Sequence, residues 1–241
     1  MTNVDTTNQN PHRVVHTQAA DFWMARFAIF LIAVLQLLLV NDFALWSRWL
    51  GPAVELLLLV PLSVATAWTQ KKARHASTDA HFHLVASGRR QIRRVALGLT
   101  VLVTLVNFVA LYFLIKALLA GHAGSGQTLL IDAMNIWCTN IIAFALWFWS
   151  IDRGGPANRG ITSRQDPDLL FPQMSLSDPR YRNWSPGFID YVFVAFTNAT
   201  AFSPTDTMPL SPRAKLLSMA EAGVSLLTLA LVAARAVNIL A

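Results

Sequence analysis

The chain has 241 residues, of which 54% are hydrophobic and 13% are charged, and its formal net charge is +6. Soluble domains carry about a quarter charged residues, so this composition excludes an ordinary soluble domain and predicts an integral membrane protein. Basic residues of membrane proteins collect on cytoplasmic loops, so the positive charge does not indicate a nucleic-acid partner.

The expected architecture is an all-α helical bundle. Residues 1–19 are polar and are expected to form a disordered cytoplasmic tail, followed by a single transmembrane domain over residues 20–241. Apolar runs of roughly 18 residues or more are typical of membrane-spanning helices. The sequence predicts six such helices, at about 21–46, 52–68, 95–120, 129–151, 184–203 and 212–240. Because 184–203 is shorter and more polar than the others, the alternative is five spans plus a re-entrant helix there.

The basic residues predict the orientation of these spans. They are concentrated after the second and fourth spans: Lys71, Lys72, Arg74, Arg89, Arg90, Arg93 and Arg94, then Arg153, Arg159, Arg164, Arg180 and Arg182. The connection at 121–128 has no lysine or arginine. By the positive-inside rule the two basic loops and the N-terminus are cytoplasmic. With six spans the C-terminus is cytoplasmic as well.

Polar residues inside the apolar runs are the candidate functional residues, because such groups are costly in hydrocarbon and face protein, water or a pathway. The helical rise of about 1.5 Å per residue places four of them near the bilayer centre. They are Gln36, Asn107, Asn140 and Glu221. Glu221 is the strongest candidate, because a carboxylate at this depth must be protonated, paired with a cation or open to water.

Other polar residues are predicted from their positions in the helical hairpins. Asp42 and Glu55 are equidistant from the first turn and should lie at similar depth near the outer surface. Lys116 and Asp132 are equidistant from the second turn, which predicts an interhelical salt bridge. One helical face of the fourth span is polar and should face protein or water rather than lipid. It carries Asp132, Asn135 and Thr139.

The C-terminal third contains a motif that is similar to a known family. Residues Thr200 to Pro209 read TAFSPTDTMP. The stretch begins with a threonine and ends with Asp-x-x-Pro, formed by Asp206 and Pro209, and Arg213 follows soon after. This stretch resembles a degenerate pore module of tetrameric cation channels, with Gly223 where the inner helix would have its hinge. The chain has Ser-Pro-Thr where that family has Gly-Tyr-Gly, and proline fixes φ near −65°, so selective potassium conduction is not implied.

The resemblance implies a channel-like or transporter-like protein that moves or senses a small cation and forms a homo-oligomer. Asp206 would gather cations at the outer mouth, together with Asp42 and Glu55. Thr197, Asn198 and Thr200 would line the route, and Glu221 would be the constriction or proton site. The whole chain also resembles uncharacterised multi-spanning proteins of the bacterial inner membrane, through Arg89–Arg94 (RRQIRR) and Asp152–Pro156 (DRGGP).

The competing hypothesis is a non-transporting membrane scaffold or assembly partner, whose polar residues hold its helices together. No nucleophile–base set and no nucleotide-binding motif stands out, so neither an enzyme nor a cofactor is predicted. A weak metal candidate lies in the first basic loop, where imidazole and carboxylate groups recur. It consists of His75, Asp79, His81 and His83.

Overall fold

The computed structural model describes residues 19–38, 52–53, 56–57, 79–119, 126–156, 166–182, 184–204 and 206–240. The long helices are α1 (Ala19–Leu37), α3 (Asp79–Leu119), α4 (Gly126–Ile151) and α7 (Pro212–Leu240). The shorter elements are the 3-10 turns at Asp152–Gly154 and Pro179–Tyr181, helices α5 (Pro172–Ser175) and α6 (Phe188–Ala201), and strands β1 (Leu169–Leu170) and β2 (Met208–Pro209).

Four described helices are long and apolar enough to cross a membrane: Ala20–Leu37, Gln91–Leu119, Gln127–Gly154 and Pro212–Ala234. The prediction of a helical protein with several helices long and apolar enough to span a membrane is confirmed, but the count of six is not. Of the predicted span at 52–68, only residues 52–53 and 56–57 are described. Where a span at 184–203 was predicted, the structure has the helix α6, whose 14 residues are fewer than the about 20 that a crossing needs.

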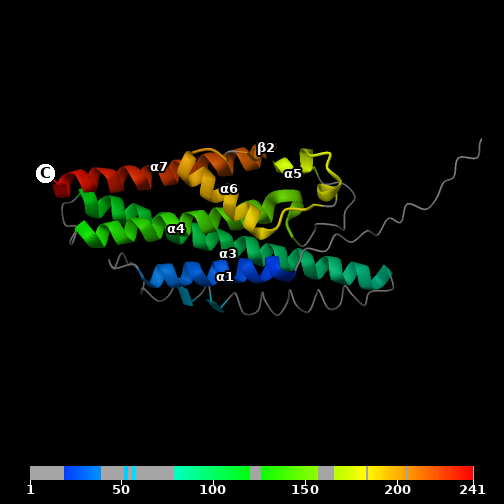
Figure 1. Cartoon of the computed structure of the whole chain (residues 1–241). Helices are drawn as coiled ribbons and strands as arrows, with labels where there is room; N and C mark the ends of the chain where they lie inside the picture. The colour runs from blue at the N-terminus through cyan, green and yellow to red at the C-terminus, as the bar shows by residue number, and fades with distance from the viewer. Residues whose placement is uncertain are drawn as a thin grey trace, which may run out of the picture.

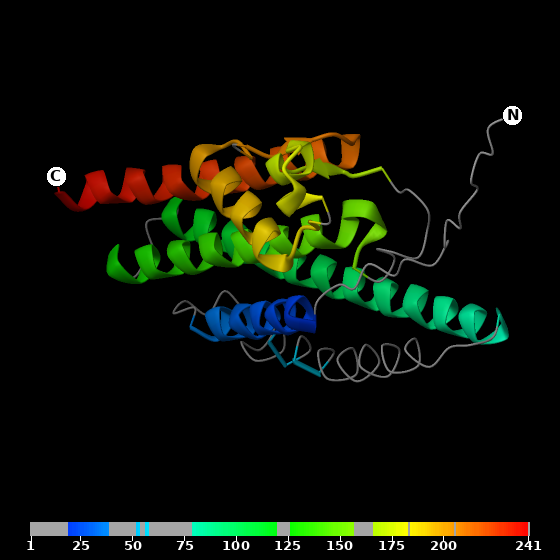
Figure 2. The ribbon, with the colours of Figure 1, turned by 45° about the vertical axis from the view of Figure 1, so that its right-hand side comes forward.

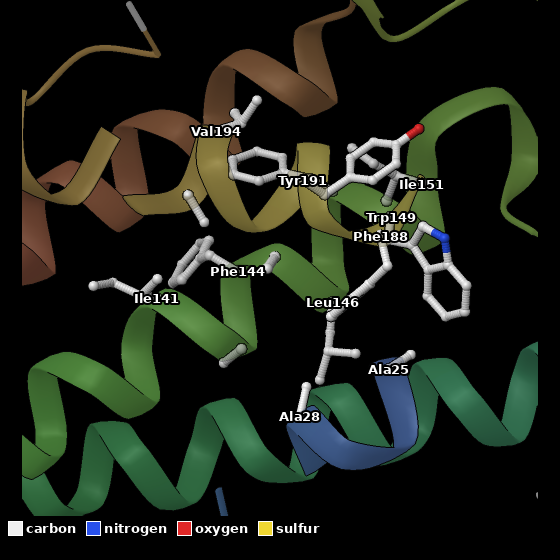
Figure 3. Packing of buried hydrophobic residues seen from close by; sticks show 14 of the residues in the cluster. Ala25, Ala28, Ile141, Phe144, Leu146, Trp149, Ile151, Phe188, Tyr191 and Val194 are labelled. Carbon is white, nitrogen blue, oxygen red and sulfur yellow. The ribbon is translucent and has the colours of Figure 1, made fainter. Parts of the chain in front are cut away.

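Helix α4 lies at the centre of an elongated bundle and packs against α1, α3, α6 and α7 (Figure 1). Its buried aromatic rings fill the space beneath α6, where Phe144 and Trp149 lie close to Tyr191 and Phe188 (Figure 3). The rings of Trp149 and Phe188 meet edge-on, with centroids 5.4 Å apart. Such contacts add stability beyond the area they bury and fix α6 against α4.

Helices α6 and α7 begin at the same end of α4 and run in the same direction. Early in α6, the Tyr191 hydroxyl donates to Asp152, which directly follows α4 (2.6 Å). Strand β2 ends three residues before α7 and pairs antiparallel with β1 near that same end. Further along both helices, Asn198 of α6 donates to Glu221 of α7. The chain after α6 therefore returns to the end at which α6 started, as Figure 1 shows.

The end of α6 is set by its C-terminal residue. Phe202 has left-handed angles, with φ 55° and ψ 26°, and follows the last helical residue. A left-handed residue is a common helix terminator, and Pro204 then excludes further helical hydrogen bonding. Helix α6 thus stops after 14 residues and the chain turns back.

The end of α4 is a sharp reversal built from three successive left-handed residues. Arg153, Gly154 and Gly155 have φ values of 50°, 73° and 84°. Two glycines adopt these angles without steric cost, whereas an arginine does not. A Cβ atom on Gly155 would lie 2.6 Å from the carbonyl oxygen of Ser150, so only glycine fits there.

Two glycine substitutions are expected to have opposite effects on stability. Gly155→Ala should lower the free energy of unfolding by about 1–3 kcal/mol, because alanine is strained at this φ and meets the Ser150 carbonyl. Gly223→Ala should raise it by about 0.5–1 kcal/mol, because α7 runs through this position and a Cβ atom there meets nothing within 4 Å. Thermal midpoints of the purified variants measure both. Equal midpoints would contradict the described reversal.

Candidate functional site

The face of α7 that packs into the bundle is polar. Ser218, Glu221, Ser225 and Thr228 are all buried, and Glu221 is 0% exposed. Their spacing of three, four and three residues places them on one face of the helix. With Asn140 of α4 and Asn198 of α6 they form what we call the polar seam. The seam follows α7 for about 15 Å, from the rise per residue.

Glu221 is the centre of the polar seam. The side-chain amide of Asn198 donates to Glu221 Oε2 at 2.8 Å and to the backbone oxygen of Ser218 at 2.9 Å. Within the described part of the chain, Glu221 Oε1 and Ser218 Oγ are buried and have no hydrogen-bond partner. An unsatisfied buried polar atom is costly, so these two oxygens mark a position where a proton or a small polar ligand would be stabilised.

The seam continues from Glu221 toward the other end of α4. Asn140 donates its amide to Ser225 Oγ across the α4–α7 contact (3.2 Å). The Thr228 hydroxyl donates to the backbone oxygen of Val224 at 2.8 Å. The predicted polar face of α4 lies inside the bundle as expected, because Asp132 and Thr139 are buried and Asn135 is partly buried.

The four polar residues predicted at mid-depth are all buried. Glu221 and Asn140 lie in the polar seam. The other two residues belong to α1 and α3 and are not part of the seam. These two are Gln36 and Asn107. The expectation that such residues face protein rather than lipid is confirmed for all four.

The structure brings only part of the predicted cation route together. Asn198 contacts Glu221, but the hydroxyls of Thr197 and Thr200 donate to backbone oxygens one turn earlier in α6, at 2.9 and 2.8 Å. Asp206 is exposed and lies in the returning segment, two residues before β2. Asp42 and Glu55 lie outside the described residues.

Two further predictions concern Lys116 and Gly223. Lys116 is exposed and lies over the ring of Tyr112, 5.6 Å from its centroid, whereas Asp132 is fully buried. Their salt bridge stays a prediction. Helix α7 is unbroken at the exposed Gly223, so a hinge there also stays a prediction.

The weak metal candidate is only partly described. His75 lies outside the described residues, whereas Asp79, His81 and His83 begin α3. Among the described residues no group of three or more His, Cys, Asp or Glu side chains is placed to hold a metal ion.

A second polar cluster, which we call the end clamp, joins the start of α7 to the end of α4. It consists of Asp152, Arg153, Asp168, Tyr191 and Arg213. Arg213 donates two hydrogen bonds to the Asp168 carboxylate, at 2.6 and 2.8 Å. Asp152 is fully buried and accepts from the backbone nitrogen of Asp168 at 2.9 Å and from the Tyr191 hydroxyl at 2.6 Å.

The end clamp is not apparent from sequence patterns. Asp152 belongs to the Asp152–Pro156 stretch and Arg213 follows the pore-like motif, but no spacing or motif links the two. Asp168 is followed by two leucines in a loop that is rich in arginine. This apolar pair is the sequence signal that part of the loop is buried. The partner of Asp168 is 45 residues away, a separation that periodicity cannot bridge.

The end clamp predicts an acid-sensitive step in stability. Burial alone would raise the pKa of the Asp168 carboxyl, but hydrogen bonds from Arg213 and Ser211 and the Arg213 charge lower it overall. A carboxyl with a lowered pKa stabilises the fold above its ordinary range, and this contribution is lost as pH falls below about 4. Asp168→Asn should therefore cost about 1.5–3 kcal/mol at pH 7 and progressively less in acid.

Thermal midpoints between pH 7 and pH 3 test this prediction. Asp178→Asn is the matched control, because the Asp178–Arg180 ion pair is exposed and contributes little. The wild-type midpoint should approach that of Asp168→Asn in acid. Equal midpoints of the two proteins at pH 7 would show that the end clamp does not stabilise the fold.

Comparison with known protein families, with curated proteins and with solved structures finds no match for this chain. The contacts of the polar seam and the end clamp are therefore the basis on which a function can be proposed.

Proposed function

We propose that this chain is a multi-pass inner-membrane protein with five crossings and one re-entrant helix. Helices α1, α3, α4 and α7 cross, the fifth crossing lies at 52–68, and α6 enters and leaves on the side of the end clamp. The common starting end of α6 and α7 supports this arrangement. The arginines after α4 support a cytoplasmic location for that side, by the positive-inside rule.

This topology places the C-terminus outside, whereas six crossings would place it in the cytoplasm with the N-terminus. A single cysteine at Ala241 in a Cys138→Ser background distinguishes the two in intact cells. We expect a membrane-impermeant maleimide to label this cysteine, and a cysteine placed at Ser177 to be labelled only after permeabilisation. Labelling of both sites only after permeabilisation would contradict the re-entrant arrangement.

We further propose that the polar seam moves a proton across part of the membrane, with Glu221 as the group that binds it. The observation that carries this proposal is the wholly buried Glu221 carboxylate, which has one oxygen held by Asn198 and the other without a described partner. Such a group in an apolar helix is expensive and is a functional-site candidate by default.

A proton suits the polar seam better than a metal ion does. Hydroxyl groups both donate and accept, so Ser218 and Ser225 on either side of Glu221 can relay a proton. A hard cation needs six or more oxygen ligands, more than the seam directs at Glu221. The seam covers about 15 Å of an apolar thickness of about 30 Å, so water must complete the path at its ends.

The order of elements in the C-terminal third is the order that the pore-module resemblance implies. A short helix, a returning segment and a long helix follow one another in α6, residues 202–211 and α7. The polar seam, however, lies between helices of one chain, so this route does not require a symmetric pore. A homo-oligomer stays a prediction of the resemblance alone.

A non-transporting scaffold is the second candidate, and one set of contacts favours it. Several buried polar groups already satisfy one another between helices: Asn140 with Ser225, and Trp147 with Thr104 at 2.9 Å. Bonds of this kind hold membrane helices together for about 1 kcal/mol or less each. In a scaffold Glu221 would only add to them.

Proton flux into liposomes that contain the purified protein separates these functions. Glu221→Gln keeps the size of the side chain and an acceptor for Asn198 but cannot exchange a proton, so we expect flux to fall to the level of empty liposomes. Thr200→Val is the matched control, because the Thr200 hydroxyl is bonded within α6 and lies on its exposed side. It should keep the wild-type rate.

The thermal midpoint of each variant must stay close to that of the wild type for the comparison to hold. Wild-type flux that Glu221→Gln leaves unchanged would contradict the assigned role of Glu221. Absence of flux from folded wild-type protein would contradict the transport proposal and favour the scaffold.

A further inference from the structure

Helix α3 is longer than a bilayer crossing requires. It has 41 residues, of which the apolar part, Gln91–Leu119, has 29. At about 1.5 Å per residue the apolar part covers about 43 Å, the thickness of a bilayer including its headgroups. Residues 79–90 then continue the same helix into the cytoplasm, and Figure 2 shows this part of α3 running out past the ends of α1 and α4.

Four arginines lie where α3 leaves the apolar part: Arg89, Arg90, Arg93 and Arg94. With about 100° of rotation per residue, they occupy an arc of about 140° on one side of the helix. The sequence has no aspartate or glutamate between Ala80 and Ile131, and the one carboxylate on this helix, Asp79, is ten residues before Arg89, about 15 Å along the axis.

The depth of these arginines follows from a contact between α3 and α4. The Trp147 indole donates to the Thr104 hydroxyl, which places these two residues at one level. Arg94 lies ten residues before Thr104, about 15 Å along α3, whereas α4 ends about 6 Å beyond Trp147. Arg94 is exposed there. Arg93 is partly buried, and its Nε has no hydrogen-bond partner among the described residues.

We propose that these four arginines, the arginine face of α3, bind the phosphate groups of anionic phospholipids in the cytoplasmic leaflet. The guanidinium fork matches two phosphate oxygens, and the sequence places four arginines within six residues of one helix at headgroup depth. Clusters of four or more basic residues next to a membrane helix bind anionic lipid surfaces in this way. The inference rests on the proposed membrane placement and not on proton movement.

The test is binding of fluorescent phosphatidylglycerol to the purified full chain in a neutral detergent, with phosphatidylcholine of the same acyl chains as reference. We expect wild-type protein to prefer phosphatidylglycerol by about tenfold or more. The variant with glutamine at all four arginines should lose this preference. The matched control has glutamine at Arg159, Arg164, Arg180 and Arg182, which removes the same net charge from the loop after α4, and should keep it.

Three results would overturn the proposal. They are equal binding of both lipids by the wild type, equal loss of preference in both variants, and displacement of the lipid by millimolar inorganic phosphate, which would assign the site to a free anion. If the four-fold variant does not fold, the pairs Arg89/Arg90 and Arg93/Arg94 are tested separately, and each should lower the preference. Because the readout is lipid binding, failure here is distinguishable from absence of proton flux.

Discussion

The fold depends on the end clamp, because its hydrogen bonds hold the start of α7 at the end of α4. Arg213 at the start of α7 is bonded through Asp168 to the segment that follows α4, and Asp152 holds both that segment and Tyr191 of α6. Burying two carboxylates is costly unless their oxygens are satisfied. Here backbone nitrogens, a phenol and a guanidinium satisfy them, so α6 and α7 are both fixed to one end of α4.

The polar seam is a consequence of that arrangement. When α6 and α7 start together and run in the same direction, Asn198 lies beside Glu221, each between two and three turns from the start of its helix. If α6 continued into a hairpin with α7, its late residues would meet the first turn of α7 instead. The buried carboxylate of Glu221 therefore has its amide partner only because the chain after α6 returns, which links the reversal at Phe202 to the site.

Local sequence patterns predicted the long helices and several of the buried polar residues. Hydropathy predicted α7 at its observed bounds. Depth along the helices placed Glu221 and Asn140 near the bilayer centre, and helical spacing placed Asp132 on a face toward protein or water; all three are buried. A return of the chain after α6 was predicted only as the alternative to a crossing, and the end clamp was not predicted, because both depend on contacts such as Asp168 with Arg213, 45 residues apart. The polar face of α7 could have been predicted from helical periodicity alone. Its residues are spaced by three, four and three positions: Ser218, Glu221, Ser225 and Thr228.

The parallel course of α6 and α7 is the central claim, and spin-label distances test it most directly. Ile189 near the start of α6 and Leu216 and Leu226 on α7 have exposed side chains, so labelled cysteines there should not disturb the bundle. In a Cys138→Ser background, pulsed electron spin resonance should give a shorter distance for the pair 189 and 216 than for the pair 189 and 226. The reverse order would show that α6 and α7 form an antiparallel hairpin and would contradict the account.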